Sequence, residues 1–410
     1  MHRYLLALTT AQLLCTAWST SSSADDWSNW RGPRHDGVSL EADWNNDWKS
    51  KPPRQAWKVN VGTGFSTVSV VGDRLYTMGN RAHGDANQPH DIVSCLNAKT
   101  GKVIWEHAYA CKFVDGFHEG GPGATPTVDG DRLYTLSRRG HLFCLSAADG
   151  EVKWSKNLLD DLGIKLGEWG MTCSPLVLGE KLIIDAGRIV AYDKQSGKQL
   201  WQTKAYRHGY GSPVAFHKNG KAHLTVLNND ALVVADAASG TIVAEHPWET
   251  RFVTTSATPV MVDDKIFVSS GYNVGCALLQ LNEGELEEVY FSRLMRNHFN
   301  NSVLYKGTLY GMDGNSHNAR NVQVVAMNAA TGRVHWSHRG YGCGSLTIAG
   351  DKLLVLSDDG TLALAEATTE KYTELASIEV LNGRCWTVPV LANGRIYCRN
   401  ADGDLVCLDV

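Results

Sequence analysis

The stretch Val70-Val71-Gly72-Asp73-Arg74-Leu75-Tyr76 places two short apolar runs on either side of a tight turn. Glycine supplies positive φ for such a turn, and aspartate hydrogen-bonds its own backbone there. Matching stretches begin at Val128, Val177, His217, Val262, Tyr305, Ile348 and Leu391. Their spacing of roughly 40–60 residues is typical of a repeated four-stranded unit. The sequence therefore predicts eight copies of one all-β unit.

A second motif follows the first at a near-constant distance and runs from Asn97 to Trp105. Copies of it run from Ser146 to Trp154, Asp193 to Trp201 and Asn328 to Trp336. The pattern indicates a strand, a glycine-containing hairpin turn and a second strand that bears a tryptophan. Because tryptophan buries a large area, we expect each one to fill the gap between neighbouring sheets.

The eighth unit ends at Val406-Cys407-Leu408-Asp409-Val410 and is one strand short. The stretch Gln55-Ala56-Trp57-Lys58-Val59 resembles the missing strand, tryptophan included. Pairing the two would remove the open edges of the first and last units. Residues 55–410 are therefore predicted to form a single eight-bladed β-propeller of four-stranded blades, closed by an N-terminal strand that pairs with the C-terminal blade.

The first residues are predicted to be a secretory signal. Tyr4 to Trp18 is mostly apolar but too short to span a bilayer, and cleavage is expected after Ala24. Residues 1–24 are thus assigned as a signal peptide, and residues 25–54 as an extension that packs on the propeller. The protein is expected to be periplasmic or secreted, without a membrane span, and monomeric. A formal net charge of −4 argues against a nucleic-acid partner.

The four strands of a blade alternate in direction, so its second and fourth connections lie on one face of the disc. The long insertions, residues 79–91, 111–123, 158–170 and 311–321, all fall on these connections. Loops displayed on a rigid scaffold commonly carry binding sites. The links between blades also lead into the innermost strands, so their ends are predicted to ring the mouth of the central channel.

Arginine, histidine and aromatic residues are concentrated in these links. Arginine suits oxyanions, and aromatic faces suit stacking. The candidate ligand-binding residues are His118, Glu119, Glu168, Trp169, Arg207, His208, Tyr210, Arg251, Arg296, His298, Asn300, Arg384 and Trp386. No metal site is predicted, because the histidines lack tight ligand spacing. No catalytic residue is assigned, because the chain has neither a nucleophile elbow nor a phosphate-binding loop.

Two parts of the repeat carry a resemblance to a known family. Ala124-Thr125-Pro126-Thr127-Val128 shows the first part, and Cys95 to Trp105 shows the second. Together they resemble the repeat of the PQQ-binding-like β-propeller superfamily. The N-terminal Trp27-Ser28-Asn29-Trp30-Arg31-Gly32-Pro33 resembles the opening of its secreted bacterial members, which are abundant in planctomycetes.

The resemblance implies two branches of function. Quinoprotein alcohol dehydrogenases hold PQQ and calcium at the channel mouth. The residues here that match such a site are Trp169 or Trp386 as a stacking floor, Glu119 or Glu168 with Asn300 or Asn301 as calcium ligands, and Arg207, Arg296 or Arg384 for the quinone carboxylates. The adjacent cysteine pair of those enzymes is missing from this chain. The other branch is similar to the propeller lipoprotein of the outer-membrane β-barrel assembly machinery, which binds partners without a cofactor.

We therefore expect a non-catalytic, exported propeller that carries no cofactor. Its ligand at the channel mouth is expected to be a small molecule, a polysaccharide or a periplasmic protein. The alternatives are a PQQ-dependent dehydrogenase and a polysaccharide-binding or polysaccharide-cleaving propeller.

Overall fold

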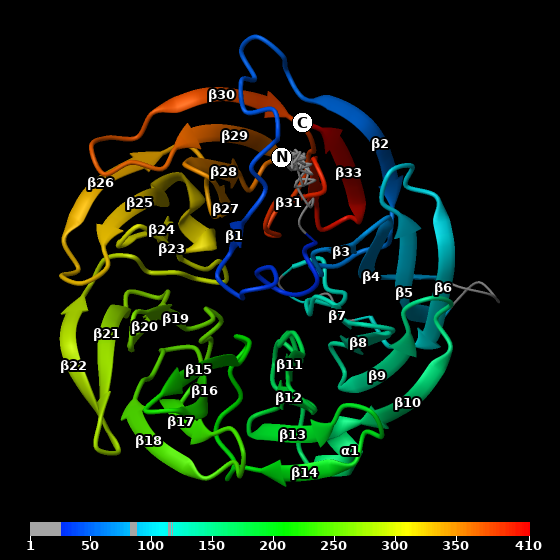
Figure 1. Ribbon diagram of the computed structural model, residues 1–410, viewed down its shortest axis with the longest axis vertical. Helices are drawn as coiled ribbons and strands as arrows, with labels where there is room; N and C mark the ends of the chain where they lie inside the picture. Colours follow the sequence, from blue (N-terminus) through cyan, green and yellow to red (C-terminus); the bar gives the residue numbers. More distant parts are fainter. Residues whose placement is uncertain (1–25, 83–87, 114–115, 117) are drawn as a thin grey trace, which may run out of the picture.

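The computed structural model describes residues 26–82, 88–113, 116 and 118–410. Its antiparallel sheets are arranged radially around a central channel (Figure 1). There are eight sheets in the described residues, each contributing the four strands of one blade. The predicted all-β, eight-bladed propeller is confirmed. The predicted signal peptide, residues 1–24, lies outside the described residues.

Each blade runs from an innermost strand beside the channel to an outermost strand at the rim. Blade 1 comprises β3 (Ser69–Val71), β4 (Arg74–Ala82), β5 (Pro89–Asn97) and β6 (Val103–Ala110), and blade 2 comprises β7 (Thr127–Asp129), β8 (Arg132–Leu136), β9 (His141–Ser146) and β10 (Val152–Asn157). Blade 3 comprises β11 (Leu176–Leu178), β12 (Lys181–Asp185), β13 (Ile189–Asp193) and β14 (Gln199–Gln202), and blade 4 comprises β15 (Val214–Lys218), β16 (Lys221–Leu227), β17 (Ala231–Asp236) and β18 (Ile242–Pro247). Blade 5 comprises β19 (Val260–Val262), β20 (Lys265–Ser270), β21 (Gly275–Asn282) and β22 (Glu285–Ser292), and blade 6 comprises β23 (Val303–Tyr305), β24 (Thr308–Asp313), β25 (Gln323–Asn328) and β26 (Val334–Arg339). Blade 7 comprises β27 (Ser345–Ala349), β28 (Lys352–Leu356), β29 (Thr361–Glu366) and β30 (Glu374–Glu379), and blade 8 comprises β31 (Val390–Ala392), β32 (Arg395–Arg399), β33 (Asp404–Asp409) and β2 (Arg54–Asn60).

The repeated tryptophans join each blade to the next one. Trp105 Nε1, on the outermost strand of blade 1, donates to the Ala147 carbonyl of blade 2 at 3.2 Å. Its indole also packs on Gly150, where an added Cβ would lie 2.6 Å from the ring. Gly150 has φ +78°, so the turn needs a glycine both for its conformation and for this contact. Trp154 repeats the arrangement against Lys194 and Gly197.

The ring closes through segments that are far apart in the sequence. Strand β2 pairs antiparallel with β33, from Arg54 opposite Asp409 to Asn60 opposite Asp404. Trp57 lies opposite Cys407, and its Nε1 donates to the Ala98 carbonyl of blade 1 at 3.0 Å. The predicted closure is confirmed, and the strand that completes blade 8 carries the same blade-to-blade contact as the others.

A buried arginine reinforces this junction. Arg399, on β32 of blade 8, is 1% exposed. Its guanidinium donates to the carbonyls of Gly62, in the link that enters blade 1, at 2.8 Å and of Met78, on the second strand of blade 1, at 2.6 Å. It also donates to the Ser66 carbonyl at 2.5 Å. A buried cation is tolerated when its donors find acceptors, and here backbone carbonyls accept from both terminal nitrogens of the guanidinium, while Nε has no partner among the described residues.

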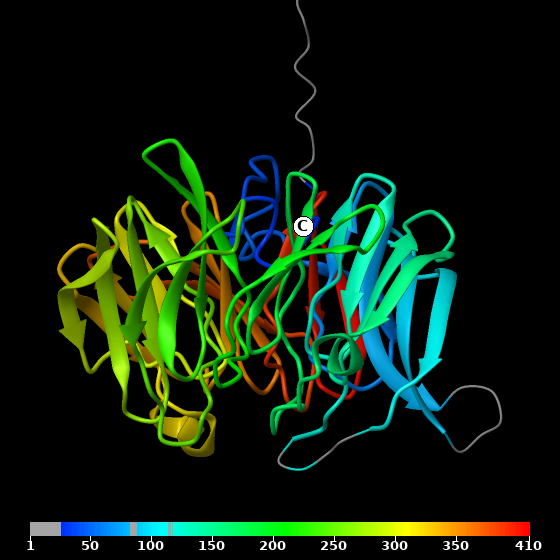
Figure 2. The same cartoon turned by 90° about the horizontal axis from the view of Figure 1, so that it is seen from below.

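Residues 26–51, which we call the N-terminal strap, cross the channel on one face of the disc (Figures 1 and 2). Within the strap, β1 (Val38–Ser39) pairs in parallel with the innermost strand of blade 7. Trp27 pairs with Val70 of blade 1 through an isolated bridge, and Ser28 accepts from Val128 of blade 2. Arg31 is 3% exposed and donates to the Ser302 carbonyl at 2.9 Å. The strap therefore ties blades on several sides of the channel together.

The two short helices among the described residues are in connections between strands. The helix α1 (Leu158–Leu162) lies between blades 2 and 3, with Asn157 accepting from Leu159 N at its start. The 3₁₀ helix η1 (Ser316–Asn321) lies between β24 and β25, on the face opposite the strap (Figure 2). None of the helices in the described ranges is long and apolar enough to cross a membrane.

Candidate functional site

A cavity of about 880 Å³ occupies the centre of the disc, and we call it the mouth pocket. Links between blades and connections on the η1 side form its walls. Its lining includes Ser316 and His317 of η1 at one end and Trp30 of the strap at the other. The pocket therefore extends from the η1 face toward the strap, which crosses the channel on the opposite face.

Aromatic side chains follow one another around the wall of the mouth pocket. Their centroid separations are 5.5 Å for Trp169 and His118, 5.2 Å for His118 and Phe65, 5.5 Å for Phe65 and Trp386, 4.0 Å for Trp386 and Phe299, 4.7 Å for Phe299 and His298, 4.7 Å for His298 and Tyr272, and 4.8 Å for Tyr272 and Phe252. We call this set the aromatic arc. It comes from seven separate links and connections, so only the closed ring brings its members together.

A second set of lining residues carries hydroxyl and amide groups. Its members are Thr172, Ser174, Ser212, Thr254, Ser256, Thr258, Asn301 and Thr387. Some are already used inside the protein, since Thr258 Oγ1 accepts from Trp30 Nε1 at 3.4 Å and Thr172 Oγ1 donates to the Tyr210 carbonyl at 2.7 Å. The Thr254 hydroxyl has no hydrogen-bond partner among the described residues. The pocket thus combines apolar ring faces with polar groups that can orient a ligand.

His118 and His298 of the mouth pocket are held in the neutral form. Burial, together with smaller effects of the nearby Arg138 and Arg384, lowers the pKa of His118 to about 4. Burial also lowers the pKa of His298 to about 4, with a smaller effect from His317. His118 Nδ1 accepts from Gly120 N at 3.0 Å, which leaves its proton on Nε2. At neutral pH these rings offer stacking surfaces and hydrogen bonds but no positive charge.

The two arginines of the pocket differ in their surroundings. Arg384 forms an ion pair with Glu119 at 3.0 Å, and its guanidinium carbon lies 4.4 Å from the centroid of the Trp386 ring. Arg138 is 7% exposed and forms no ion pair or side-chain hydrogen bond with another described residue. Burial accordingly lowers the pKa of Arg138.

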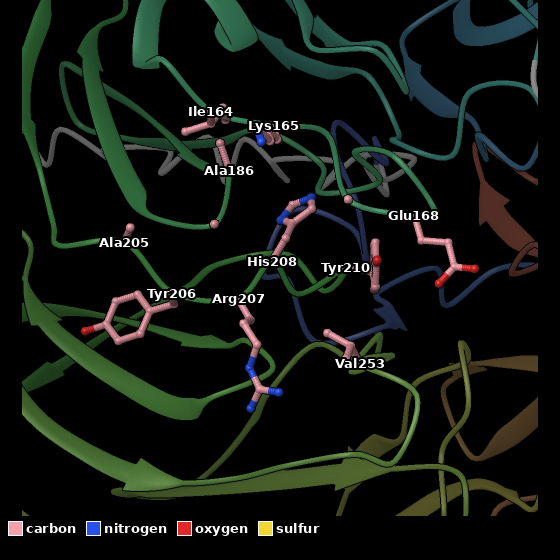
Figure 3. Close-up of a pocket in the computed structure, with 12 residues that line it drawn as sticks. Ile164, Lys165, Glu168, Ala186, Ala205, Tyr206, Arg207, His208, Tyr210 and Val253 are labelled. Atoms are coloured by element: carbon pink, nitrogen blue, oxygen red, sulfur yellow. The ribbon is translucent and has the colours of Figure 1, made fainter.

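A smaller cavity of about 450 Å³, the side pocket, lies beside blades 3 and 4 (Figure 3). Glu168 and Tyr210 line both cavities, so the two are adjacent. His208 and Arg207 are neighbours in the chain but point in opposite directions (Figure 3). Burial lowers the pKa of His208 to about 4, so this ring is neutral as well.

Asp185, just before the side-pocket residues Ala186 and Gly187, gives a testable pH dependence. Its carboxyl is buried and accepts from Gly187 N at 3.1 Å, and burial raises its pKa to about 7. Because the folded protein binds this proton more tightly than the unfolded chain, its stabilising contribution is complete below about pH 4 and disappears as pH rises through 7. We expect Asp185→Asn to reduce the fall in unfolding free energy between pH 5 and 8 by about 2 kcal/mol, as measured by urea titration. Equal pH slopes for the two proteins would contradict this assignment.

The structure brings part of the predicted residue set together. His118, Glu168, Trp169, Tyr210, His298, Arg384 and Trp386 line the mouth pocket, and Arg207 and His208 line the side pocket. Glu119 touches the mouth pocket only through its ion pair with Arg384. Arg251 is exposed, with its guanidinium carbon 5.2 Å from the Phe252 ring centroid.

Three predicted residues are engaged within the protein. Arg207 forms ion pairs with Asp230 at 2.6 Å and Glu249 at 3.0 Å. Arg296 pairs at 2.7 Å with Asp313, whose side chain is 2% exposed. Asn300 is buried and donates to the Gly344 carbonyl at 3.1 Å. The two arginine pairs hold their links against the ends of second strands, and Asn300 joins its link to the one that enters blade 7.

Several residues of the mouth pocket were missed by sequence reasoning. Phe65 precedes the first repeat, and Arg138 and Tyr272 lie in connections between second and third strands. Phe299 stands beside predicted residues in its link. The sequence did offer one signal for these residues. The connection between the second and third strands of a blade lies on the same face of the disc as the links between blades, so residues of both can reach one pocket.

The donor groups do not fit PQQ with calcium. Glu119 is paired with Arg384, and Asn301 Oδ1 accepts from Thr258 N at 2.6 Å. Arg207 and Arg296 are paired with internal carboxylates. Within the described ranges, no group of three or more His, Cys, Asp or Glu side chains is placed to hold a metal ion.

The profile of a family described as "Outer membrane protein assembly factor BamB" matches residues 89–318 and 306–410. The chain belongs to this family. Outer membrane protein assembly factor BamB of Yersinia pestis is 22% identical over 304 residues, covering 70% of each chain. The protein of the same name from Escherichia coli is 22% identical over 372 residues, covering 86% of this chain and 87% of the relative.

Solved structures show the same fold at low sequence identity. BamB from Moraxella catarrhalis superposes with a TM-score of 0.59 at 18% identity, covering 87% of this chain and 98% of that one. A quinohemoprotein alcohol dehydrogenase from Comamonas testosteroni superposes with a TM-score of 0.71 at 13% identity, covering 94% of this chain and 80% of that one. The predicted PQQ-like propeller family is confirmed, and the likeness to the dehydrogenase is one of fold.

Proposed function

We propose that this protein is a non-catalytic periplasmic scaffold of outer-membrane protein assembly, and that it holds a segment of a partner protein at the mouth pocket. Family membership supports the class of function, because the named relatives are assembly factors. The aromatic arc supports the mouth pocket as the binding site. Stacked rings and exposed aromatic edges bind the side chains of a partner by burying apolar surface area, and this requires no reaction chemistry.

The surroundings of the pocket fit a polypeptide better than a compact metabolite. The mouth pocket continues toward the side pocket through Glu168 and Tyr210, and Val253 lines the side pocket while its neighbour Phe252 belongs to the arc. Phe252 and Val253 are 50% and 37% exposed. An extended segment could therefore place one side chain in the channel and another beside blades 3 and 4.

The test is capture of the partner from the cell envelope. We expect the tagged protein to retain an identified outer-membrane assembly protein, and Trp386→Ala to lower the amount captured at least tenfold. Trp386 stacks with Phe65 and contacts Phe299, so its removal breaks the arc. Phe252→Ser, which changes a half-exposed ring, is expected to act in the same direction with little effect on folding.

Lys102→Ala is the matched control, because Lys102 is exposed in the tight turn between β5 and β6, away from the mouth pocket. Unchanged capture by both aromatic variants would place the contact elsewhere. Alcohol-dependent dye reduction after addition of PQQ and calcium would favour the dehydrogenase alternative. Retention on a polysaccharide column that is lost in Trp386→Ala would favour the sugar-binding alternative.

A further inference from the structure

Arg138 is a buried cation that forms no ion pair or side-chain hydrogen bond within the part of the chain that the structure describes. Only 7% of its surface is exposed, and it lines the mouth pocket. Burying an arginine without an anion or a carbonyl to accept its hydrogen bonds is unfavourable for the fold. The other buried arginines avoid this cost, since Arg399 and Arg31 donate to backbone carbonyls.

The position of Arg138 is fixed by its neighbours in the link between blades 2 and 3. Met171 N donates to the Arg138 carbonyl at 2.8 Å. Gly170 packs so closely that an added Cβ would lie 2.3 Å from Arg138 Cγ. The stem of the side chain is therefore held in place, and a fixed guanidinium loses little freedom when it binds a ligand.

None of the described carboxylates close to the pocket forms an ion pair with Arg138. Glu119 is taken by Arg384. Asp91 influences Arg138 through space but makes no ion pair with it, and Asp91 Oδ1 accepts from Asn80 at 2.7 Å. Glu168 is exposed at the rim. Of the two guanidiniums that line the mouth pocket, Arg138 is therefore the one without an ion pair among the described residues, and it lies near the His118 ring, which stacks on Trp169.

We propose that Arg138 is an anion subsite that binds a carboxylate carried next to an aromatic or apolar group. The planar guanidinium donates two parallel hydrogen bonds to the carboxylate, while the attached group stacks against the aromatic arc. This inference rests on the proposed function for the source of the ligand, a partner segment. The subsite itself is tested without that partner.

Phenylacetate and phenylacetamide are suitable probes, because they share a ring and differ in charge. In calorimetric titrations at pH 7 and low salt, we expect phenylacetate to bind at least tenfold more tightly than phenylacetamide. Arg138→Gln should reduce that preference to twofold or less and leave phenylacetamide binding unchanged. Arg138→Lys should keep part of the preference for phenylacetate. Added salt should weaken the binding of phenylacetate but not that of phenylacetamide.

Arg139→Gln is the control, because Arg139 is adjacent in the chain and outside the pocket lining. Equal binding of the two probes to the unchanged protein would overturn the proposal, as would a preference that survives Arg138→Gln. If Arg138→Gln fails to fold, the comparison of the two probes on the unchanged protein and on Arg138→Lys still decides the question.

Two peptides distinguish the source of the carboxylate. One carries an internal aspartate beside tryptophan with an amidated end, and the other carries asparagine beside tryptophan with a free end. Arg138-dependent binding of the first assigns the subsite to acidic side chains, and that of the second assigns it to a chain terminus. If phenylacetate binding depends on Arg138 but partner capture is unchanged in Arg138→Gln, the subsite holds and its use by the partner is excluded.

Discussion

Trp105→Ala is expected to lower the free energy of unfolding by about 3–5 kcal/mol. The indole is 9% exposed and fills the joint between blades 1 and 2, so its removal leaves a cavity that the turn of blade 2 cannot fill. Trp105→Phe keeps an aromatic ring and loses the donor to Ala147, and should cost less. The midpoint of urea unfolding, followed by far-ultraviolet circular dichroism, measures both changes.

The partner glycine supplies a second measurement at the same joint. Gly150→Ala places a Cβ 2.6 Å from Trp105, so it should destabilise through this clash and through its positive φ. In the Trp105→Ala background the clash is absent, and only the backbone effect should remain. Additive effects in the double variant would show that the two residues act independently and would contradict the proposed joint.

Arg399→Leu is expected to have an effect of similar size, about 3–5 kcal/mol, for an electrostatic reason. The substitution leaves the carbonyls of Gly62, Ser66 and Met78 buried without this donor. Each unsatisfied polar group costs about 1–3 kcal/mol. Arg399→Lys keeps the charge but cannot reach all these carbonyls, so it should recover only part of the loss.

Arg395→Leu is the matched control on the same strand. Arg395 pairs with Asp409 at 3.1 Å near the surface, and such pairs contribute at most about 1 kcal/mol. Comparable losses for the two leucine variants would show that β32 simply tolerates leucine poorly. A loss confined to Arg399 supports its role in joining blade 8 to blade 1.

Much of the architecture was predictable from the repeat. The spacing of Val70 and its counterparts gave the number of blades, and the likeness of Trp57 to the tryptophans at blade ends gave the closing strand. The route of the strap was not predictable, because β1 is only two residues long and its parallel pairing with β27 leaves no pattern.

The site was harder to predict, because it depends on which charged side chains form ion pairs within the protein. Arg207 and Arg384 look alike as residues of inter-blade links, yet the first pairs with Asp230 and Glu249 at the edge of the side pocket, whereas the second pairs with Glu119 inside the mouth pocket. Arg138 stands in a short turn with no insertion, so nothing in the sequence set it apart. Its importance comes from burial and from the absence of a counter-charge in the described residues, which only the folded ring reveals.

The strap has a consequence for the order in which the molecule is built. Its partners belong to separate parts of the ring: Val70 and Val128 in blades 1 and 2, Thr258 and Ser302 at the entries to blades 5 and 6, and Ile348 and Leu391 in blades 7 and 8. These positions surround the channel only after all the blades have assembled. Docking of the strap should therefore occur late in folding, after the ring of blades has closed. In a partly folded protein, Trp27 and Trp30 would remain exposed to solvent and would distinguish it from the complete fold.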